Sequence, residues 1–198
     1  MSIIWPCPLT PSSYADGRET PVPAQECPSC HRPLTNWGGY WRWVRAERVA
    51  ERQIWIRRGW CARCRRTQAL LPSFLFARRL DADTVIGSAL EQAATGTGAR
   101  PIARSLEIPH TTVRDWWRRV KSKAPGLLAS ALALATSLDP ASVELRTDGA
   151  SAVLEALECA WQRARRLLAS RTPDQWAFWS LISGGLALAP HTSPPLPG

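Results

Sequence analysis

Four cysteines are the residues of this chain whose type and spacing predict the most definite chemistry. Cys27-Pro-Ser-Cys30 and Cys61-Ala-Arg-Cys64 form two Cys-x-x-Cys pairs with thirty residues between them. Cysteines at this spacing can direct both sulfurs to one point, and two such pairs complete a tetrahedron around zinc with Zn–S distances of about 2.3 Å. Four protein ligands leave no open coordination position. The sequence therefore predicts one structural Zn²⁺ bound by Cys27, Cys30, Cys61 and Cys64.

Three alternatives to this zinc site remain open. Two disulfides are disfavoured if the protein is cytoplasmic, which we expect because its start lacks a basic segment followed by a long apolar run. Iron in a rubredoxin-like site uses similar spacing and would make the chain an electron-transfer protein. His31 could replace one cysteine as a ligand. Cys7 and Cys159 stay outside the cluster, and Cys159 falls on the apolar face of a helical stretch.

Positive charge is concentrated around the paired cysteines. The formal net charge is +9, and residues 27–79 hold 12 of the 25 basic residues but only 2 of the 16 acidic ones. This clustering favours a polyanionic partner, with nucleic acid before an anionic membrane. Apolar stretches at 127–138 and 176–190 are too short or too interrupted to span a bilayer. We therefore expect no membrane partner.

The elements that would position the cysteines form a β-hairpin. Residues 40–45 and 53–57 are rich in Trp, Ile and Val and predict two strands, joined by a polar loop at 46–52. The hairpin would bring the two cysteine pairs together in a zinc ribbon spanning residues 24–79. Residues 1–23 are rich in proline without apolar periodicity and are expected to be an extended or disordered leader.

After residue 80 the pattern is helical. Helices are predicted to about residue 94, from about 101, and over 109–123, and Pro125-Gly126 is expected to break the chain. Further helices are predicted over 127–137, 150–170 and 173–183. The domain order is thus a helical unit at 80–124, C-terminal helices at 125–187 and a proline-rich tail at 188–198.

Residues 99–119 have the apolar pattern of two helices packed across a tight turn. Ile102, Leu106 and Ile108 line the first helix and the turn, and Val113 and Trp116 anchor the second helix. The segment resembles the helix-turn-helix of bacterial DNA-binding proteins, especially the N-terminal modules of insertion-sequence transposases. It departs from that pattern in one place, since Glu107 stands where the turn usually has glycine. Glu107 must then adopt an unusual backbone angle, or the turn must differ.

The resemblance implies that the second helix enters the major groove of double-stranded DNA. Its first turns would then direct His110, Thr111 and Arg114 to base edges, with Arg114 suited to a bidentate contact with guanine. Phosphate contacts are predicted for basic residues around this helix and on the ribbon. Asp115 could pair with a neighbouring arginine or accept from a cytosine amino group. The predicted phosphate-binding residues are Arg100, Arg104, Arg118, Arg119, Lys121, Arg57, Arg58, Arg65 and Arg66.

Tryptophans of the ribbon have two possible roles. Trp41, Trp43 and Trp55 alternate with arginines and could stack on bases, but in a small metal domain such residues more often form the core. Within the C-terminal helices, the large apolar side chains either form a homodimer interface or pack on the helix-turn-helix, and packing is the favoured interpretation. These side chains are Trp161, Leu168, Trp176, Trp179 and Ile182.

No catalytic constellation is predicted. A transposase-type nuclease needs three carboxylates holding two metal ions on a sheet. The acids after residue 124 fall at helix starts or on a solvent face, in a region too short for such a domain. We therefore expect a non-enzymatic protein.

The whole sequence predicts an α+β, mostly α fold: a four-Cys zinc ribbon, a helix-turn-helix and a C-terminal helical segment. This order resembles bacterial zinc-ribbon and helix-turn-helix proteins of unknown function that are linked to mobile elements. It implies a sequence-specific DNA-binding protein, either a transposon-associated accessory factor or a transcriptional regulator in the cytoplasm with the nucleoid. A transposase or recombinase encoded nearby would be its protein partner. An iron electron-transfer protein and an RNA-binding zinc-ribbon module are the alternatives.

Overall fold

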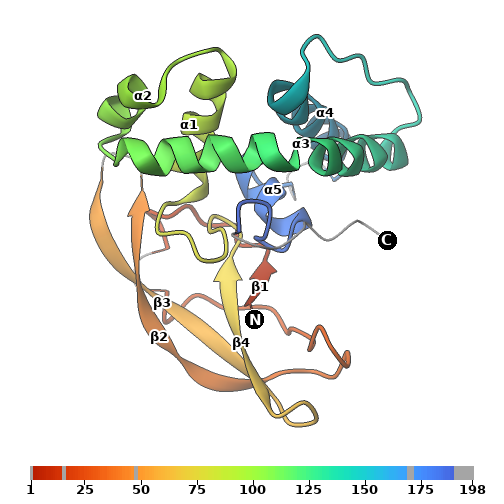
Figure 1. Ribbon diagram of the computed structural model, residues 1–198. Helices are drawn as coiled ribbons and strands as arrows, with labels where there is room; N and C mark the ends of the chain where they lie inside the picture. The colour runs from red at the N-terminus through yellow and green to blue at the C-terminus, as the bar shows by residue number, and fades with distance from the viewer. Residues whose placement is uncertain (1, 15–16, 47–48, 169–171, 190–198) are drawn as a thin grey trace.

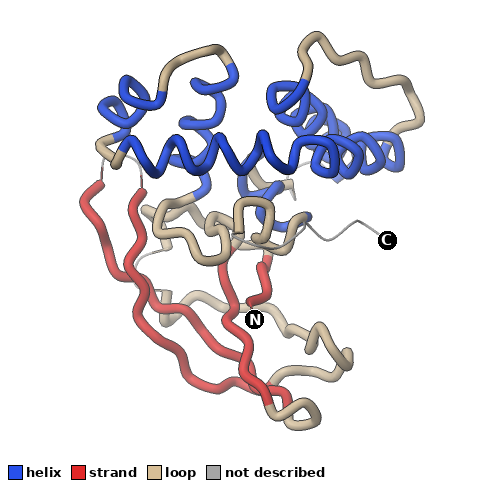
Figure 2. Tube along the Cα trace, in the orientation of Figure 1, coloured by secondary structure: helices blue, strands red, loops and turns tan. Residues whose placement is uncertain are grey.

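The computed structural model describes residues 2–14, 17–46, 49–168 and 172–189. A four-stranded sheet forms one half of the molecule and five helices form the other half (Figures 1 and 2). The fold is therefore α+β, as predicted. The elements are β1 (Ser2–Trp5), β2 (Thr35–Ala46), β3 (Val49–Cys61), β4 (Arg66–Pro72), α1 (Asp83–Ala94), α2 (Ala99–Leu106), α3 (His110–Leu138), α4 (Gly149–Leu168) and α5 (Gln175–Ile182).

The sheet has the strand order β1-β4-β3-β2. The predicted hairpin is present as β2 and β3, but both strands are longer than expected, because a third antiparallel strand, β4, pairs with β3. Trp41 lies opposite Trp55 across the hairpin, and β2 forms one edge of the sheet. The long strands extend from the helical half to the opposite end of the molecule (Figure 1).

The expected extended or disordered leader at 1–23 is wrong for its first part. Ser2–Trp5 forms β1 and pairs in parallel with β4, and Trp5 is 1% exposed. Tyr14 is also buried, with its ring edge-on to Phe74 and its hydroxyl donating to the carbonyl of Trp55. The leader therefore supplies apolar side chains to the core of the sheet, which the two strands of a hairpin could not build alone.

The helical half has its own apolar core. The predicted helix before residue 94 is α1, and its Val85, Ile86, Ala89 and Leu90 are all buried. This core continues through α2, α3, α4 and α5, and it also takes in Phe76 from the segment between β4 and α1. A packed helical core of this size is stabilised by burial of apolar surface rather than by helix propensity.

The predicted break at Pro125-Gly126 is wrong, because α3 continues through it to Leu138. The helix therefore crosses the domain boundary expected at residue 124. Proline in a helix interior removes one hydrogen bond and costs about 3 kcal/mol. Pro125 and Gly126 are exposed, while Ala124 and Leu127 on either side are buried in the helical core. Burial on that face offsets the local cost.

Two features fix the C-terminal helices. Arg163 of α4 is buried, and its guanidinium donates to the carbonyls of Ala135, Asp139, Ala141 and Ser142, which follow or end α3. It thus holds the end of α3 and the segment after it against α4. At Gly87 of α1, a Cβ atom would lie 2.2 Å from the ring of Trp176, so α5 packs on α1 only because this position is glycine.

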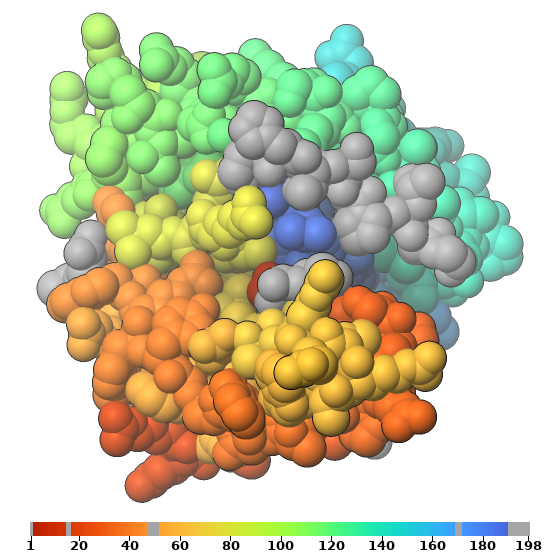
Figure 3. Space-filling view, turned by 60° about the horizontal axis from the view of Figure 1, so that its bottom comes forward, coloured from red at the N-terminus to blue at the C-terminus, as the bar shows by residue number. Residues whose placement is uncertain are grey.

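The two halves are joined by backbone and side-chain hydrogen bonds. Arg45 at the end of β2 exchanges backbone hydrogen bonds with the segment before α1 and forms a 3.1 Å ion pair with Asp81. Ser180 of α5 donates to the carbonyl of Leu75, and Ala77 donates to the carbonyl of Gly185. Figure 3 shows the strands (red to yellow) packed directly against the helices (green to blue).

The predicted tail begins inside the fold. Leu188 and Ala189 are buried, and Lys123 of α3 donates to the carbonyls of Ala187 and Ala189. The rest of the predicted tail lies outside the described residues. None of the helices in the described ranges has the length and apolar character needed to cross a membrane.

Candidate metal centre and nucleic-acid interface

The four predicted cysteines converge on one point. Their sulfur atoms all lie within 4.8 Å of one another, with 3.8 Å between Cys27 and Cys64 and 3.5 Å between Cys30 and Cys61. A tetrahedral ion with Zn–S distances of about 2.3 Å requires S···S distances of about 3.8 Å. The cluster therefore has the size and the donor set of a four-thiolate metal site.

Each cysteine pair lies on a tight turn of the same kind. In the first, the amides of Cys30 and His31 both donate to the carbonyl of Cys27. In the second, which joins β3 to β4, the amide of Cys64 donates to the sulfur of Cys61. The residue after each pair is left-handed, with φ of 55° at His31 and 52° at Arg65. Matching turns present the two pairs of sulfurs to each other.

The electrostatics of the cluster favour a bound cation. Backbone hydrogen bonding at Ser29 lowers the pKa of the Cys27 thiol to about 6. A hydrogen bond with Cys30 and burial raise the pKa of Cys64 to about 12. A divalent cation would stabilise all four as thiolates, since metal binding to cysteine displaces the proton.

The two other cysteines do not take part. Cys7 is buried beside Ser73, and burial raises the pKa of its thiol, as expected for an inert cysteine. Cys159 lies on α4 and packs against a small apolar cluster between α3, α4 and α5. His31 is exposed, whereas Cys27 and Cys61 are fully buried. The cysteines alone make up the candidate site.

The segment predicted to bind DNA forms two helices, α2 and α3, joined by the three residues 107–109. Its anchors are buried as predicted, with Ile102, Val113 and Trp116 at most 1% exposed. Glu107 adopts the left-handed conformation, with φ of 54°, and the amide of Ile108 donates to the carbonyl of Ala103. Glu107 therefore occupies a left-handed position that glycine adopts without strain, at a cost in strain.

The first turns of α3 present polar side chains to solvent. His110, Thr111 and Arg114 are all exposed, and their spacing places Arg114 on the same helix face as the other two. Arg100 and Arg104 of α2 and Lys121 further along α3 are exposed as well. The predicted base-contacting residues are thus brought together, with basic residues on both sides.

Asp115 forms ion pairs with two of the arginines that were predicted to contact phosphate. Its carboxylate accepts from Arg118 at 2.6 Å and from Arg119 at 2.7 Å. Burial raises the pKa of Asp115, but the hydrogen bonds from Arg119 and Arg118 outweigh it, and the net shift is downward. Arg118 remains 74% exposed at its side chain, whereas Arg119 is 22% exposed. Of the pair, Arg118 is the one placed to reach a phosphate.

Two further arginines, Arg45 and Arg79, lie beside these helices; the sequence placed Arg45 only among the phosphate-binding residues of the ribbon and gave no role to Arg79. Arg45, at the β2 end of the hairpin, lines a shallow hollow with Arg100, Arg104 and His110. Arg79 lines a second hollow with Thr111 and Arg114 on α3. Both come from segments distant in sequence from α3, so no local motif could have indicated them.

Some arginines of the ribbon are held by hydrogen bonds within the protein, and others have exposed side chains. Arg42 donates to the carbonyls of Phe76 and Arg79, and burial lowers its pKa. Arg57 donates to the carbonyl of Arg18 and Arg58 to the hydroxyl of Thr67. Arg63, Arg65 and Arg66 are exposed around the second cysteine pair.

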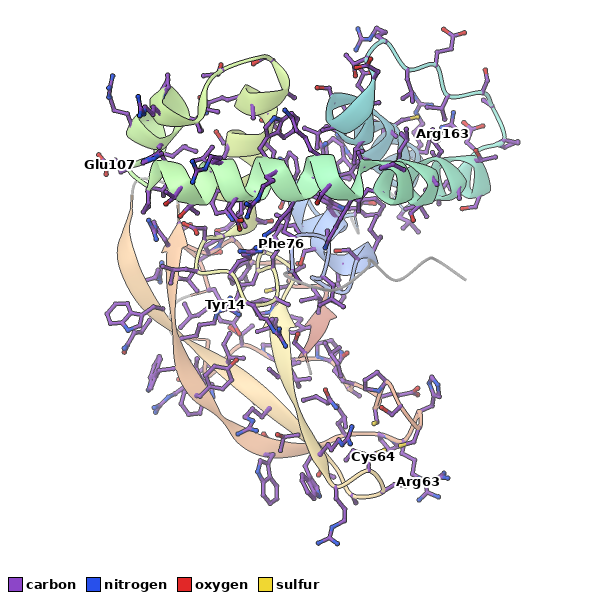
Figure 4. All side chains as sticks on the ribbon, in the orientation of Figure 1. Tyr14, Arg63, Cys64, Phe76, Glu107 and Arg163 are labelled. Carbon is purple, nitrogen blue, oxygen red and sulfur yellow. The ribbon has the colours of Figure 1, made fainter. Side chains whose placement is uncertain are left out.

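The candidate metal centre and the candidate DNA-binding helices lie at opposite ends of the molecule. Figure 4 shows Cys64 and Arg63 at the end of the sheet away from the helices, and Glu107 at the other end beside α3. The charged surface of the metal end is therefore separate from that of α2 and α3.

Comparison with known protein families matches residues 27–116 to a family described as a domain of unknown function, DUF6431. The matched range begins at the first metal-site cysteine and ends at Trp116 of α3. It thus joins the cysteine cluster and the α2–α3 turn in one unit. Comparisons with curated proteins and with solved structures gave no match.

Proposed function

We propose that this protein binds double-stranded DNA sequence-specifically, without catalysing a reaction, by placing the first turns of α3 in the major groove. The observation that carries the proposal is the exposed cluster of His110, Thr111 and Arg114, held on a helix whose opposite face is anchored by buried Val113 and Trp116. A helix-turn-helix needs this combination of a fixed inner face and a polar outer face.

Within this proposal Arg114 makes the specific contact. An arginine fork matches the O6 and N7 acceptors of guanine, and a good bidentate pair contributes about 1–3 kcal/mol of discrimination. His110 and Thr111 contact neighbouring base edges. Asp115 is bound by Arg118 and Arg119, so it orients these side chains instead of accepting from cytosine.

Phosphate contacts would hold α3 in the groove. Arg100 and Arg104 lie on one side of its N-terminus, and Arg118 and Lys121 lie further along it. Arg119 supports Arg118 through their shared carboxylate. On the ribbon, Arg57 and Arg58 are half-buried and Arg65 and Arg66 are exposed. Because the ribbon's metal end is remote from α3, Arg65 and Arg66 would reach a different stretch of backbone from the α3 residues.

The metal in this proposal is zinc, and its role is structural. Cys27, Cys30, Cys61 and Cys64 would supply all four ligands, so no position is left for a substrate or water. The ion would fix the segment before β2 to the β3–β4 turn. The bound ion would thus hold the distal end of the sheet together, where few apolar side chains are buried.

The biological setting we propose is a transposon-associated accessory factor or a transcriptional regulator, acting at the nucleoid. A transposase or recombinase encoded nearby would be the partner in the first case. Trp176 and Trp179 are buried in the helical core, so a homodimer through the C-terminal helices would have to use the exposed Leu167, Leu168 and Ile182.

The test is to select bound sequences from a random duplex pool and then measure Arg114→Ala on the selected site. We expect the variant to lose about 1–3 kcal/mol of discrimination at one base pair. The matched control is Arg166→Ala, an exposed arginine on α4, which should leave discrimination unchanged. If Arg114→Ala weakens all sequences equally, Arg114 contacts only phosphate. If no sequence is enriched, specific DNA recognition is wrong.

A further inference from the structure

Strand β2 exposes an unusual number of large aromatic side chains. Trp37 is 55% exposed, Trp43 50%, Trp41 40% and Tyr40 39%. Trp41 and Trp43 share one face of the sheet with Trp55, whereas Trp37 stacks on Trp60, which lies on the opposite face. Neighbouring exposed tryptophans are costly in water and mark a surface that binds something.

The rings are held in place by their neighbours. Trp37 stacks on Trp60 with ring centroids 5.1 Å apart and 26° between the planes. Trp41 meets Trp55 edge-on, and the guanidinium of Arg18 lies 4.9 Å from the Trp41 ring. Preordered rings lose little conformational freedom on binding a planar partner.

The charge around these rings points to an anionic partner. Residues 27–46 and 52–79 contain no aspartate or glutamate. Arg57 and Arg58 lie on β3, which pairs with β2, and exposed Arg18 lies over the rings. A second copy of this chain would bring the same positive charge to this face and be repelled. The combination of exposed rings and arginines favours nucleic acid with accessible base faces.

We infer that the sheet face at β2 that carries Trp41, Trp43 and Trp55 binds single-stranded nucleic acid, with unpaired bases stacking on Trp41 and Trp43 and arginines meeting the phosphates. Residues two apart on a strand are about 6.8 Å apart. This is roughly twice the 3.4 Å rise between stacked nucleotides, so one base fits between the rings of Trp41 and Trp43. Aromatic platforms beside a positive groove bind single strands with little sequence preference.

This site is distinct from the duplex site proposed on α3. The side chains of α3 would contact base edges in the major groove of a duplex, whereas the tryptophans of β2 would stack on the faces of unpaired bases. A protein with both sites would hold duplex and single-stranded DNA together, as occurs wherever strands are opened beside a bound sequence.

The experiment measures binding of oligo(dT) and oligo(U) by the full-length protein at fixed salt, using Trp41→Ala/Trp43→Ala. Each lost base stack should raise Kd by about 5- to 150-fold. Trp37→Ala removes an exposed tryptophan from the opposite face of the sheet and is the matched control, which should bind as the unmodified protein does. Binding of oligo(dT) alone would identify single-stranded DNA as the ligand. Binding of both oligonucleotides would show that the site recognises stacked bases whether the sugar is deoxyribose or ribose.

A second pair of variants guards against misfolding. Trp43→Ala should weaken binding, and Trp43→Tyr should restore most of it because tyrosine keeps a stacking face. The inference is overturned if Trp41→Ala/Trp43→Ala binds oligo(dT) and oligo(U) as well as Trp37→Ala does, or if neither oligonucleotide binds the unmodified protein. It is also overturned if the Trp41→Ala/Trp43→Ala change instead abolishes self-association. Duplex binding should survive Trp41→Ala/Trp43→Ala, so the two proposals can fail separately.

Discussion

The two ends of this molecule hold their shape by different means. At the helical end, a continuous core runs from Phe76 to Leu188 and includes side chains from all five helices. At the far end of the sheet, Trp37 is exposed, and Cys27 and Cys61 are fully buried. A metal can replace a core that a small unit lacks. We infer that a metal held by the four thiols would stabilise one end where burial of apolar surface stabilises the other.

The largest effect is expected from removing one ligand. Structural zinc contributes about 10–16 kcal/mol of apparent binding free energy in small domains. Cys61→Ser should therefore lose nearly all bound metal and disorder the β3–β4 turn, while the helices remain folded. Metal analysis and circular dichroism measure these outcomes, with Cys159→Ser as the control. Unchanged metal content in Cys61→Ser would show that the ligand set is wrong. One bound iron in the unmodified protein would show that the site is an electron-transfer centre instead of a structural zinc site.

A core truncation should affect the other end. Leu157 of α4 is 1% exposed, whereas Leu167 on the same helix is 62% exposed. Leu157→Ala should lower the free energy of unfolding by about 2–5 kcal/mol through lost burial and a cavity. Leu167→Ala should change it little. Denaturant unfolding measures both, and metal content should stay unchanged under native conditions. Metal loss in folded Leu157→Ala would mean that the two ends are not separately stabilised.

Substitution of Arg163 tests whether a buried charged side chain also contributes to the stability of the helical end. Its guanidinium donates to four carbonyls around the end of α3. Arg163→Leu would remove this donor from all four carbonyls, of which that of Ala135 keeps the amide of Asp139, and we expect a loss of about 2–4 kcal/mol in unfolding free energy. Arg166→Leu, on the exposed side of the same helix, should stay within about 0.5 kcal/mol. Equal effects from the two variants would contradict this role of Arg163.

The smallest effect is expected at the strained turn. Glu107 has φ of 54°, which costs about 1–2 kcal/mol for a residue with a Cβ atom. Glu107→Gly removes this strain but adds freedom to the unfolded chain, so we expect a net gain of about 0.5–1 kcal/mol. Thermal unfolding measures it. A loss of stability would show that the glutamate side chain makes a contribution larger than the strain.

The cysteine cluster could be predicted from sequence because its geometry is local. Two residues between cysteines are enough to form each turn, and the hairpin that unites the turns has its own apolar pattern. The α2–α3 turn was predictable for the same reason, since its anchors repeat at helical spacing. In both cases neighbouring residues determine the arrangement.

The features that sequence reasoning missed depend on distant partners. Ser2 pairs with Ala69 across the sheet, and nothing within the first residues indicates that partner. Pro125 predicts a helix break by local chemistry, but burial of Ala124 and Leu127 against other helices keeps α3 continuous. The exposure of Trp43 was likewise unpredictable, because it depends on which strand lies at the sheet edge.

The most direct test is hydrogen exchange of the full-length protein with and without a strong chelator. If metal holds one end and apolar burial the other, chelation should remove protection from amides near Cys27–Cys30 and Cys61–Cys64 while α1, α3 and α4 stay protected. Loss of protection spread evenly over both halves, or no change at the cysteines, would contradict the distinction.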